Sequence, residues 1–260
     1  MLSEHSVVEA ARAAGIVAPA HYVKVTGSTN TDLLALAREG APEWTLVVAG
    51  EQRSGRGRLG RTWSSLEGRS LLASILLRPE LSPSDAPLLS LLVAVCMVRA
   101  IRSTNGVDVT CKWPNDLVVG ERKLGGILTE ASVDSERLSF VVVGTGVNVA
   151  EEPNDFPPEL RPTATSILME GGRVYGIALL REYLRELRHL YSPTGENLRS
   201  TVLAEYRSVC STIGQKVTAR TLAGGETRGR AVGISESGEL LVRSGSTVEA
   251  VGFGEVLHLR

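Results

Sequence analysis

The longest apolar run of the chain, residues 87–100, limits the possible folds more than any other segment. It is too short to cross a bilayer and is interrupted by Ser90 and Arg99, so it belongs inside a soluble protein. Continuous apolar residues at helical length predict a buried helix over residues 85–102. Other elements must therefore pack around this helix.

Short β-rich runs, separated by further helical patterns, lie on both sides of that segment. Polar residues precede the pattern of Leu33, Leu34 and Leu36, and Gly40 ends it, which predicts a helix from Thr29 or Thr31 to Arg38. The other predicted helices cover residues 7–14, 176–191 and 196–209. Strands are predicted at residues 21–25, 44–49, 70–77, 109–113, 117–119, 126–131 and 138–149. Residues 51–62, rich in glycine and arginine, are expected to form a loop.

The sequence pattern changes after Ser211. From there on, glycines separate short β-rich runs such as residues 216–221 and 240–243. Short strands joined by glycine turns predict a small antiparallel β-barrel. The sequence therefore divides into a catalytic domain over residues 1–210 and a small barrel domain over residues 211–260.

Composition excludes several classes of protein. The chain has 260 residues, 43% of them hydrophobic and 22% charged, which is typical of a globular protein and not of a disordered one. A net charge of -1 gives no overall attraction to nucleic acid or to an anionic membrane. The 3 cysteines have no metal-ligand spacing, so a reducing, cytoplasmic compartment is expected.

The loop that begins at Ser54 contains Gly55, Gly57 and Gly60, which match the dinucleotide fingerprint G-x-G-x-x-G. That fingerprint also needs a strand before the glycines, a helix after them, and an acidic residue at the end of the next strand. Here Arg78 and Pro79 occupy the position where the acidic residue would lie, so a nicotinamide-dinucleotide site is not expected.

Four arginines in and beside the same loop offer a different interpretation: Arg53, Arg56, Arg58 and Arg61. Guanidinium groups match phosphate oxygens, and glycines let the backbone approach a ligand closely. A solvated basic turn would look the same, and the alternation of glycine with arginine does not separate the two. Because of its glycines and like charges, the loop is expected to be disordered until a ligand binds.

Three later segments place polar groups at junctions between strands and loops. They are residues 112–117 (Lys-Trp-Pro-Asn-Asp-Leu), residues 123–128 (Lys-Leu-Gly-Gly-Ile-Leu) and residues 144–148 (Gly-Thr-Gly-Val-Asn). Each could be only a hairpin turn, a bulge or a strand end. Together they supply a lysine, exposed backbone and an amide to accompany the arginine loop.

At this point the sequence resembles the biotin–protein ligase family. Residues 55–61 resemble the signature loop of that family, and residues 112–117, 123–128 and 144–148 resemble its other blocks in the same order. Ser28, Thr29 and Asn30 match the motif that opens its first active-site helix. The resemblance runs from about Thr26 to the end of the chain. Few residues precede Ser28, so the N-terminal helix-turn-helix of the repressor branch, and with it DNA binding, is not expected.

The resemblance implies a two-step reaction with ATP, biotin and Mg²⁺. Biotin is adenylated, and biotinyl-5′-adenylate then gives its biotinyl group to a lysine of a biotin carboxyl carrier domain of an acyl-CoA carboxylase. Lys123 and Arg58 are implied to be catalytic. Residues implied to bind biotin are Ser28, Thr29, Asn30, Gln52, Arg56, Gly57, Arg58 and Lys123. Residues implied to bind ATP or the adenylate are Arg56, Arg58, Arg61, Lys112, Asn115, Asp116, Lys123 and Asn148, with Asp116 holding Mg²⁺ through water.

Three rival functions stay open. A lipoate–protein ligase or octanoyltransferase would share the fold, a regulatory protein could keep the fold without the activity, and a nucleic-acid-binding protein would show salt-dependent affinity. The expected fold is α+β: a mixed, largely antiparallel sheet with helices, followed by the small barrel. A monomer or weak dimer with no membrane contact is expected.

Overall fold

The computed structural model describes residues 2–134, 137–195, 198–220, 225–252 and 255–258. Its larger part is built on a seven-stranded sheet with the strand order β1-β2-β5-β9-β8-β7-β6. The strands are β1 (Ala20–Thr26), β2 (Leu46–Gln52), β5 (Ser70–Leu77), β6 (Thr110–Lys112), β7 (Asp116–Val119), β8 (Arg122–Asp134) and β9 (Arg137–Asn148). Only β1 and β2 pair in parallel within this sheet. The prediction of a mixed, largely antiparallel sheet is therefore confirmed.

Helix α3 (Ala86–Asn105) is the central helix of the core, as predicted from its apolar run. By length and composition the segment Pro83–Asn105 could cross a membrane, but 72% of that apolar window is buried inside the protein. It packs against α4 (Gly176–Leu190), α5 (Leu198–Val209) and one face of the sheet. Tertiary packing thus accounts for its apolar residues.

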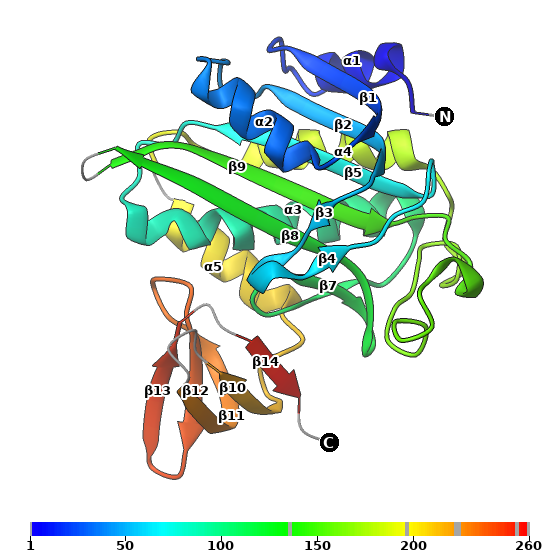
Figure 1. Cartoon of the computed structure of the whole chain (residues 1–260). Helices are drawn as coiled ribbons and strands as arrows, with labels where there is room; N and C mark the ends of the chain where they lie inside the picture. Colours follow the sequence, from blue (N-terminus) through cyan, green and yellow to red (C-terminus); the bar gives the residue numbers. More distant parts are fainter. Residues whose placement is uncertain (1, 135–136, 196–197, 221–224, 253–254, 259–260) are drawn as a thin grey trace.

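A single helix, α2 (Thr29–Arg38), packs on part of the opposite face of the sheet (Figure 1). Beneath it lies a small apolar cluster that includes Leu33, Leu76 and Val142. Further along the same face, alternation in β5 and β9 replaces these apolar residues with Ser74 and Gly144. This end of the sheet therefore has room for a cavity.

The N-terminal helix α1 (Glu4–Ala13) begins three residues earlier than the sequence pattern predicted. Ser3 and Ser6 form a capping box there, which satisfies backbone donors of the first turn. The helix packs on α4 and β1.

The prediction of a plain loop over residues 51–62 is wrong in part. Residues there form a two-stranded hairpin of β3 (Gly55–Arg56) and β4 (Thr62–Trp63), joined by the 3-10 turn η1 (Arg58–Gly60). The turn needs left-handed backbone at Leu59 (φ 58°) and Gly60 (φ 72°). Two further 3-10 turns are η2 (Pro83–Asp85) and η3 (Pro153–Asp155).

The C-terminal part is a five-stranded antiparallel sheet with the order β13-β12-β11-β10-β14. Its strands are β10 (Lys216–Arg220), β11 (Glu226–Ile234), β12 (Leu240–Ser244), β13 (Thr247–Val251) and β14 (Glu255–His258). Trp113 joins it to the larger sheet, because its indole Nε1 donates to the Gly238 carbonyl at 2.9 Å.

Candidate active site

The N-terminus of α2 forms one end of the site. The backbone N–H and the hydroxyl of Thr29 both donate to Oε1 of Gln52, at 2.8 and 2.9 Å. Ser74, on the neighbouring β5, donates to Thr29 Oγ1. Ser28 is the N-cap residue but its side chain makes no capping bond, so its hydroxyl can serve a ligand. These short polar side chains suit a small neutral ligand with both donors and acceptors.

Asn30 differs from its neighbours because its amide is occupied within the protein. Nδ2 donates to the Leu128 carbonyl at 3.2 Å and to Glu130 Oε2 at 2.8 Å. Oδ1 accepts from Ser74 at 2.6 Å. A Cβ at Gly144 would collide with this amide, so only glycine at this position lets the Asn30 side chain approach β9 so closely. Asn30 therefore shapes this end of the site more than it offers free hydrogen-bonding groups to a ligand.

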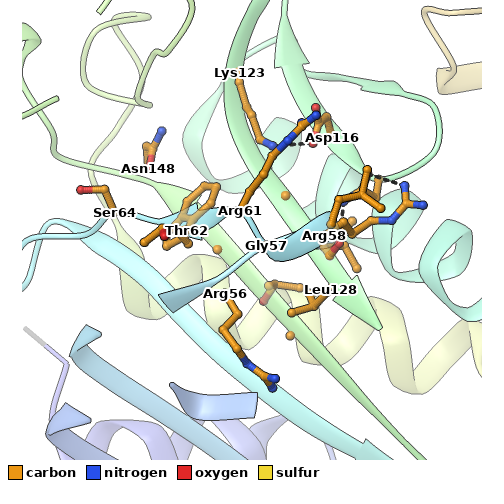
Figure 2. A pocket seen from close by; sticks show the side chains of 18 of the residues that line it. Arg56, Gly57, Arg58, Arg61, Thr62, Ser64, Asp116, Lys123, Leu128 and Asn148 are labelled. Atoms are coloured by element: carbon orange, nitrogen blue, oxygen red, sulfur yellow. Dashed lines mark hydrogen bonds and ion pairs between the residues drawn. The ribbon is translucent and has the colours of Figure 1, made fainter. Parts of the chain in front are cut away.

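The β3–β4 hairpin, with residues 54–61 as the arginine loop, lies beside this end of the sheet (Figures 1 and 2). The loop turns back on itself through a bond from Gly57 N to the Arg61 carbonyl at 2.7 Å. Arg58 Nη1 donates to Asn115 Oδ1 at 3.2 Å, which brings the loop to the junction between β6 and β7. Trp63 packs on Gly146 of β9, where a Cβ would come within 2.7 Å of the indole ring.

Positive charge collects at the other end of the site. Lys123 Nζ lies 2.6 Å from Asp116 Oδ1 and 5.9 Å from the centre of the Trp63 ring. Burial lowers the pKa of Arg58, Asp116 partly offsets that effect, and Arg61 adds to it by repulsion. Lys123 pairs with Asp116, and Arg58 and Arg61 come from the loop to the same end of the site (Figure 2). Positive side chains at this end of the site would stabilise a bound anion.

Both ends open into one cavity of about 330 Å³, a volume that suits a small-molecule ligand. All of the site residues predicted from the sequence line it: Ser28, Thr29, Asn30, Gln52, Arg56, Gly57, Arg58, Arg61, Lys112, Asn115, Asp116, Lys123 and Asn148. The roles of the individual residues remain predictions.

Two of these residues lie differently from the simplest expectation. The side chain of Arg56 points away from Lys123 and Asp116 (Figure 2), and its guanidinium pairs with Glu130 at 2.6 Å. Asn148 is buried, and its Nδ2 donates to the Thr165 carbonyl at 2.8 Å. Its Oδ1 and the second hydrogen of Nδ2 are not used by this bond.

A third wall of the cavity was not predicted from the sequence. It is formed by Phe156, Leu160, Thr163 and Ala164, from the segment between β9 and α4. The Lys123 N–H donates to the Thr163 carbonyl, and the Thr165 N–H donates back to the Lys123 carbonyl. This segment therefore fixes the backbone of Lys123, although nothing in its sequence pattern marks it. Glu130 was also missed, although alternation along β8 places it on the same face as Gly126 and Leu128.

The donor set fits a magnesium ion that arrives with a nucleotide. No group of three or more His, Cys, Asp or Glu residues that could hold a metal occurs in the described part of the chain. Magnesium needs no such cage, because it binds through one or two carboxylates together with substrate phosphates and water. Asp116 is a carboxylate that lines the cavity.

The comparisons with known proteins agree with this geometry. The model of the Biotin/lipoate A/B protein ligase family matches residues 22–148. The model of the Biotin protein ligase C terminal domain matches residues 212–259. The two matches cover the larger sheet with its hairpin and the C-terminal sheet.

Relatives are similar over most of their length. A biotin--[acetyl-CoA-carboxylase] ligase of Mycobacterium tuberculosis is 34% identical over 245 residues, which are 92% of this chain and 88% of that protein. The bifunctional ligase/repressor BirA of Bacillus subtilis is 36% identical over 231 residues, covering 88% of this chain and 71% of that one. A biotin protein ligase from Aquifex aeolicus, solved with biotin and ATP, superposes with a TM-score of 0.75 at 26% identity, over 93% of this chain and 99% of that one.

Proposed function

This chain belongs to the biotin protein ligase family, and on that premise we propose how its residues perform the ligase reaction. The enzyme uses ATP to convert biotin into biotinyl-5′-adenylate and then transfers the biotinyl group to a carrier lysine. The observation that carries the assignment is a cavity that joins short polar side chains at one end to Lys123, Arg58 and Asp116 at the other.

In the first step an oxygen of the biotin carboxylate forms a bond to the α-phosphorus of ATP, and pyrophosphate leaves. Two anions must meet, so fixed positive charge and positioning are the main contributions of the protein. Lys123 is proposed for this role, because its ammonium has three donors and can keep Asp116 while it contacts the carboxylate and the phosphate. Arg58, held in a partly buried place by Asn115, adds a second charge.

At the biotin end, the ureido ring offers one carbonyl acceptor and two N–H donors. Ser28 and Thr29 supply hydroxyl groups there, and Nε2 of Gln52 makes no hydrogen bond within the described residues. Polar groups in an otherwise apolar slot each need a partner, which favours the ureido ring over a plain acyl chain. Asn30 is proposed to hold Thr29 and Ser74 in position and not to bind the ureido ring itself.

At the nucleotide end, Lys112, Asn115, Arg61 and the remaining oxygen of Asn148 are proposed to contact ATP. Magnesium at Asp116 would neutralise phosphate charge when it is bound. The glycines of the arginine loop would let it close over the adenylate and keep water from the anhydride. That this loop orders only when ligand binds stays a prediction.

In the second step the amine of the carrier lysine attacks the carbonyl carbon of the adenylate, AMP leaves, and the nitrogen loses a proton. The proposed carrier is the biotin carboxyl carrier domain of an acyl-CoA carboxylase, because relatives are named for that substrate. The three cysteines are free and buried, which supports a cytoplasmic location.

Three structural assignments accompany this function. We propose that the domains divide at residues 210/211 and that the C-terminal antiparallel sheet is the small barrel expected from the sequence. We also propose a monomer or weak dimer. Of the two edge strands of the larger sheet, β6 has three residues and resists strand addition, whereas β1 has seven and could support a weak dimer.

The decisive test supplies Mg-ATP with either biotin or lipoate and follows pyrophosphate release and acyl-adenylate formation. Biotin-dependent release is expected, and Lys123→Ala should lower its rate by about 10²–10³ because it removes the main fixed charge. Lys216→Ala, on the exposed start of β10, is the matched control and should behave as the parent protein does. Release with lipoate alone would assign the chain to the lipoate branch, and release with neither would favour a regulatory role.

A further inference from the structure

Glu130 lies at the biotin end of the site but belongs to none of the groups assigned above. It is on β8, two residues beyond Leu128 and four beyond Gly126, so all three project from the same face of the strand. Its side chain is 26% exposed. Gly126 and Leu128 line the cavity, and Glu130 stands just outside it, against the arginine loop.

A single carboxylate oxygen of Glu130 connects a buried group with a surface group. Oε2 accepts from Asn30 Nδ2 at 2.8 Å and from Arg56 Nη2 at 2.6 Å. Asn30 is in turn held by Ser74 and by the Leu128 carbonyl. The oxygen is therefore fixed from the protein interior, while Arg56, whose side chain is 42% exposed, belongs to the arginine loop.

The loop is attached to the rest of the fold at more than one point, including a bond from the Ser54 N–H to the Gly27 carbonyl at 2.9 Å. The β3–β4 hairpin contains two residue pairs, Gly55 with Trp63 and Arg56 with Thr62, which is too little pairing to be stable alone. Arg58 attaches the phosphate side of the loop through Asn115. The pair of Arg56 with Glu130 attaches the biotin side, and charge-assisted hydrogen bonds are stronger than neutral ones.

We propose that Glu130 is a positioning residue that anchors the arginine loop to the biotin pocket through Arg56. The inference rests on the proposed function, because the loop is taken to close over biotinyl-adenylate. In this proposal Arg56 does not bind phosphate but holds the closed loop against β8 through Glu130. Arg58 and Arg61 are then the arginines that face the phosphate. The anchor slows loss of the adenylate and leaves its formation nearly unchanged.

The test is a double-mutant cycle of Glu130→Gln, Arg56→Gln and the combined variant. The rate of adenylate formation is measured in a single turnover, and the release rate of preformed biotinyl-adenylate is measured in a chase with unlabelled biotin and ATP. Each single variant should release the adenylate about tenfold faster, the effect of losing one charge-assisted bond. In Glu130→Gln, which alters no residue of the cavity lining, the rate of formation should change by about twofold or less. The combined variant should be no worse than either single one, because both act on one contact.

A second measurement does not depend on adenylate formation. It is made both without ligand and with biotin and ATP, because the loop is expected to order when a ligand binds. Trypsin cleaves after arginine, so the rate of cleavage within residues 54–61 reports how often the loop leaves the sheet. Cleavage after Arg58 and Arg61, sites that all of the variants keep, should be faster in Glu130→Gln and Arg56→Gln, without new cleavage elsewhere in the chain. Glu205→Gln is the matched control, because it breaks a pair of similar length, 2.7 Å to Arg99, at a distance from the cavity.

The possible failures are distinguishable. If the parent protein forms no adenylate from biotin, the proposed function fails, while the cleavage rates still test the anchor. If adenylate forms but Glu130→Gln releases it at the parental rate, the anchor is wrong. Slower release from Glu130→Gln would also overturn it, because Glu130 would then compete with the ligand for Arg56.

Discussion

Glycines on β8 and β9 have no side chain, so side chains from other elements can approach the sheet closely at these positions. Asn30 occupies the space above Gly144, the Trp63 ring covers Gly146, and the Lys123 side chain passes 3.5 Å from where a Cβ of Gly126 would be. Each contact brings one functional group toward the cavity. The glycines of this face are therefore part of the site although they carry no chemistry themselves.

Gly146→Ala tests this arrangement. The added methyl group would lie 2.7 Å from the Trp63 ring, so the indole and the adjoining hairpin must shift. We expect a loss of about 1–3 kcal/mol in the free energy of unfolding, typical of overpacking. The KM for biotin should also rise, because Trp63 lines the cavity.

Urea unfolding and steady-state kinetics measure both effects. Gly176→Ala is the control, because nothing lies within 4 Å of a Cβ there and the position begins a helix. An unchanged KM in Gly146→Ala would show that the Trp63 position does not matter for binding.

At the level of elements, helix α2 carries the polar triplet Ser28, Thr29 and Asn30 at its first turn, and its other end needs support. Arg78, directly after β5, supplies it. Its Nη2 donates to the Ala37 carbonyl at 3.2 Å and to the Ala41 carbonyl at 2.8 Å. The guanidinium also lies 5.7 Å from the centre of the Phe140 ring. One side chain thereby satisfies carbonyls at and just beyond the C-terminus of the helix.

Arg78→Met should keep the apolar contact with Phe140 and lose the hydrogen bonds. The expected cost is about 1–3 kcal/mol in the free energy of unfolding, because the carbonyls lose a charged donor. Arg12→Met is the control, since Arg12 is well exposed and 4.0 Å from Glu9, and such pairs contribute little. Equal stability of the two variants, measured in urea, would contradict this role for Arg78.

At the level of the whole molecule, the two sheets meet near the site. Trp113 donates from its backbone N–H to Thr212 Oγ1 at 3.0 Å and from its indole to the Gly238 carbonyl. Val256 of β14 lines the cavity beside the residues of the larger sheet. The C-terminal sheet is therefore one wall of the site. Both these polar contacts and a shared apolar cluster hold it against the larger sheet.

Trp113→Phe removes the indole donor and leaves the Gly238 carbonyl without it. The C-terminal sheet should then detach more readily, by about 1–2 kcal/mol, and exchange its amide hydrogens faster than the larger sheet does. Trp44→Phe makes the same chemical change within the larger part of the fold. It should lower protection there without a specific effect on residues 216–251. The same exchange pattern in both variants would rule out a specific docking role.

Global stability should also depend on pH through Glu151, which is buried between Ser70 and the segment that forms the third wall. Burial raises the pKa of Glu151 to about 7 from 4.5, although Ser70 donates to the carboxylate. The unfolded chain therefore loses this proton first as pH rises. The contribution of Glu151 to the free energy of unfolding is complete below about pH 4.5. It is lost as pH rises to about 7, and the loss is about 3 kcal/mol at most.

Glu151→Gln cannot ionise and should lose this component of the pH dependence. The free energy of unfolding, measured in urea between about pH 5 and pH 8, should fall less in the variant than in the parent. Glu152→Gln is the control, because that neighbouring carboxylate is well exposed. Parallel pH profiles of parent and Glu151→Gln would contradict the assignment.

Local patterns in the sequence were sufficient for most elements and for the chemical groups of the site. The apolar run of α3 predicted a buried helix, because a helix without a polar face has to be covered. The polar triplet at the start of α2, the arginine loop and the lysine near two glycines marked residues that do line one cavity. These features are local, and secondary-structure periodicity and side-chain chemistry are enough to find them.

Only the tertiary structure decided which of those groups are free for a ligand. Asn30 is occupied by contacts from β5 and β8, Arg56 pairs with Glu130 from 74 residues away, and Asn148 donates to Thr165. The third wall, around Phe156, has no recognisable pattern, because its part in the cavity depends on backbone bonds to Lys123. Pairings between distant residues are set by strand register and packing, and no local pattern in this sequence contains that information.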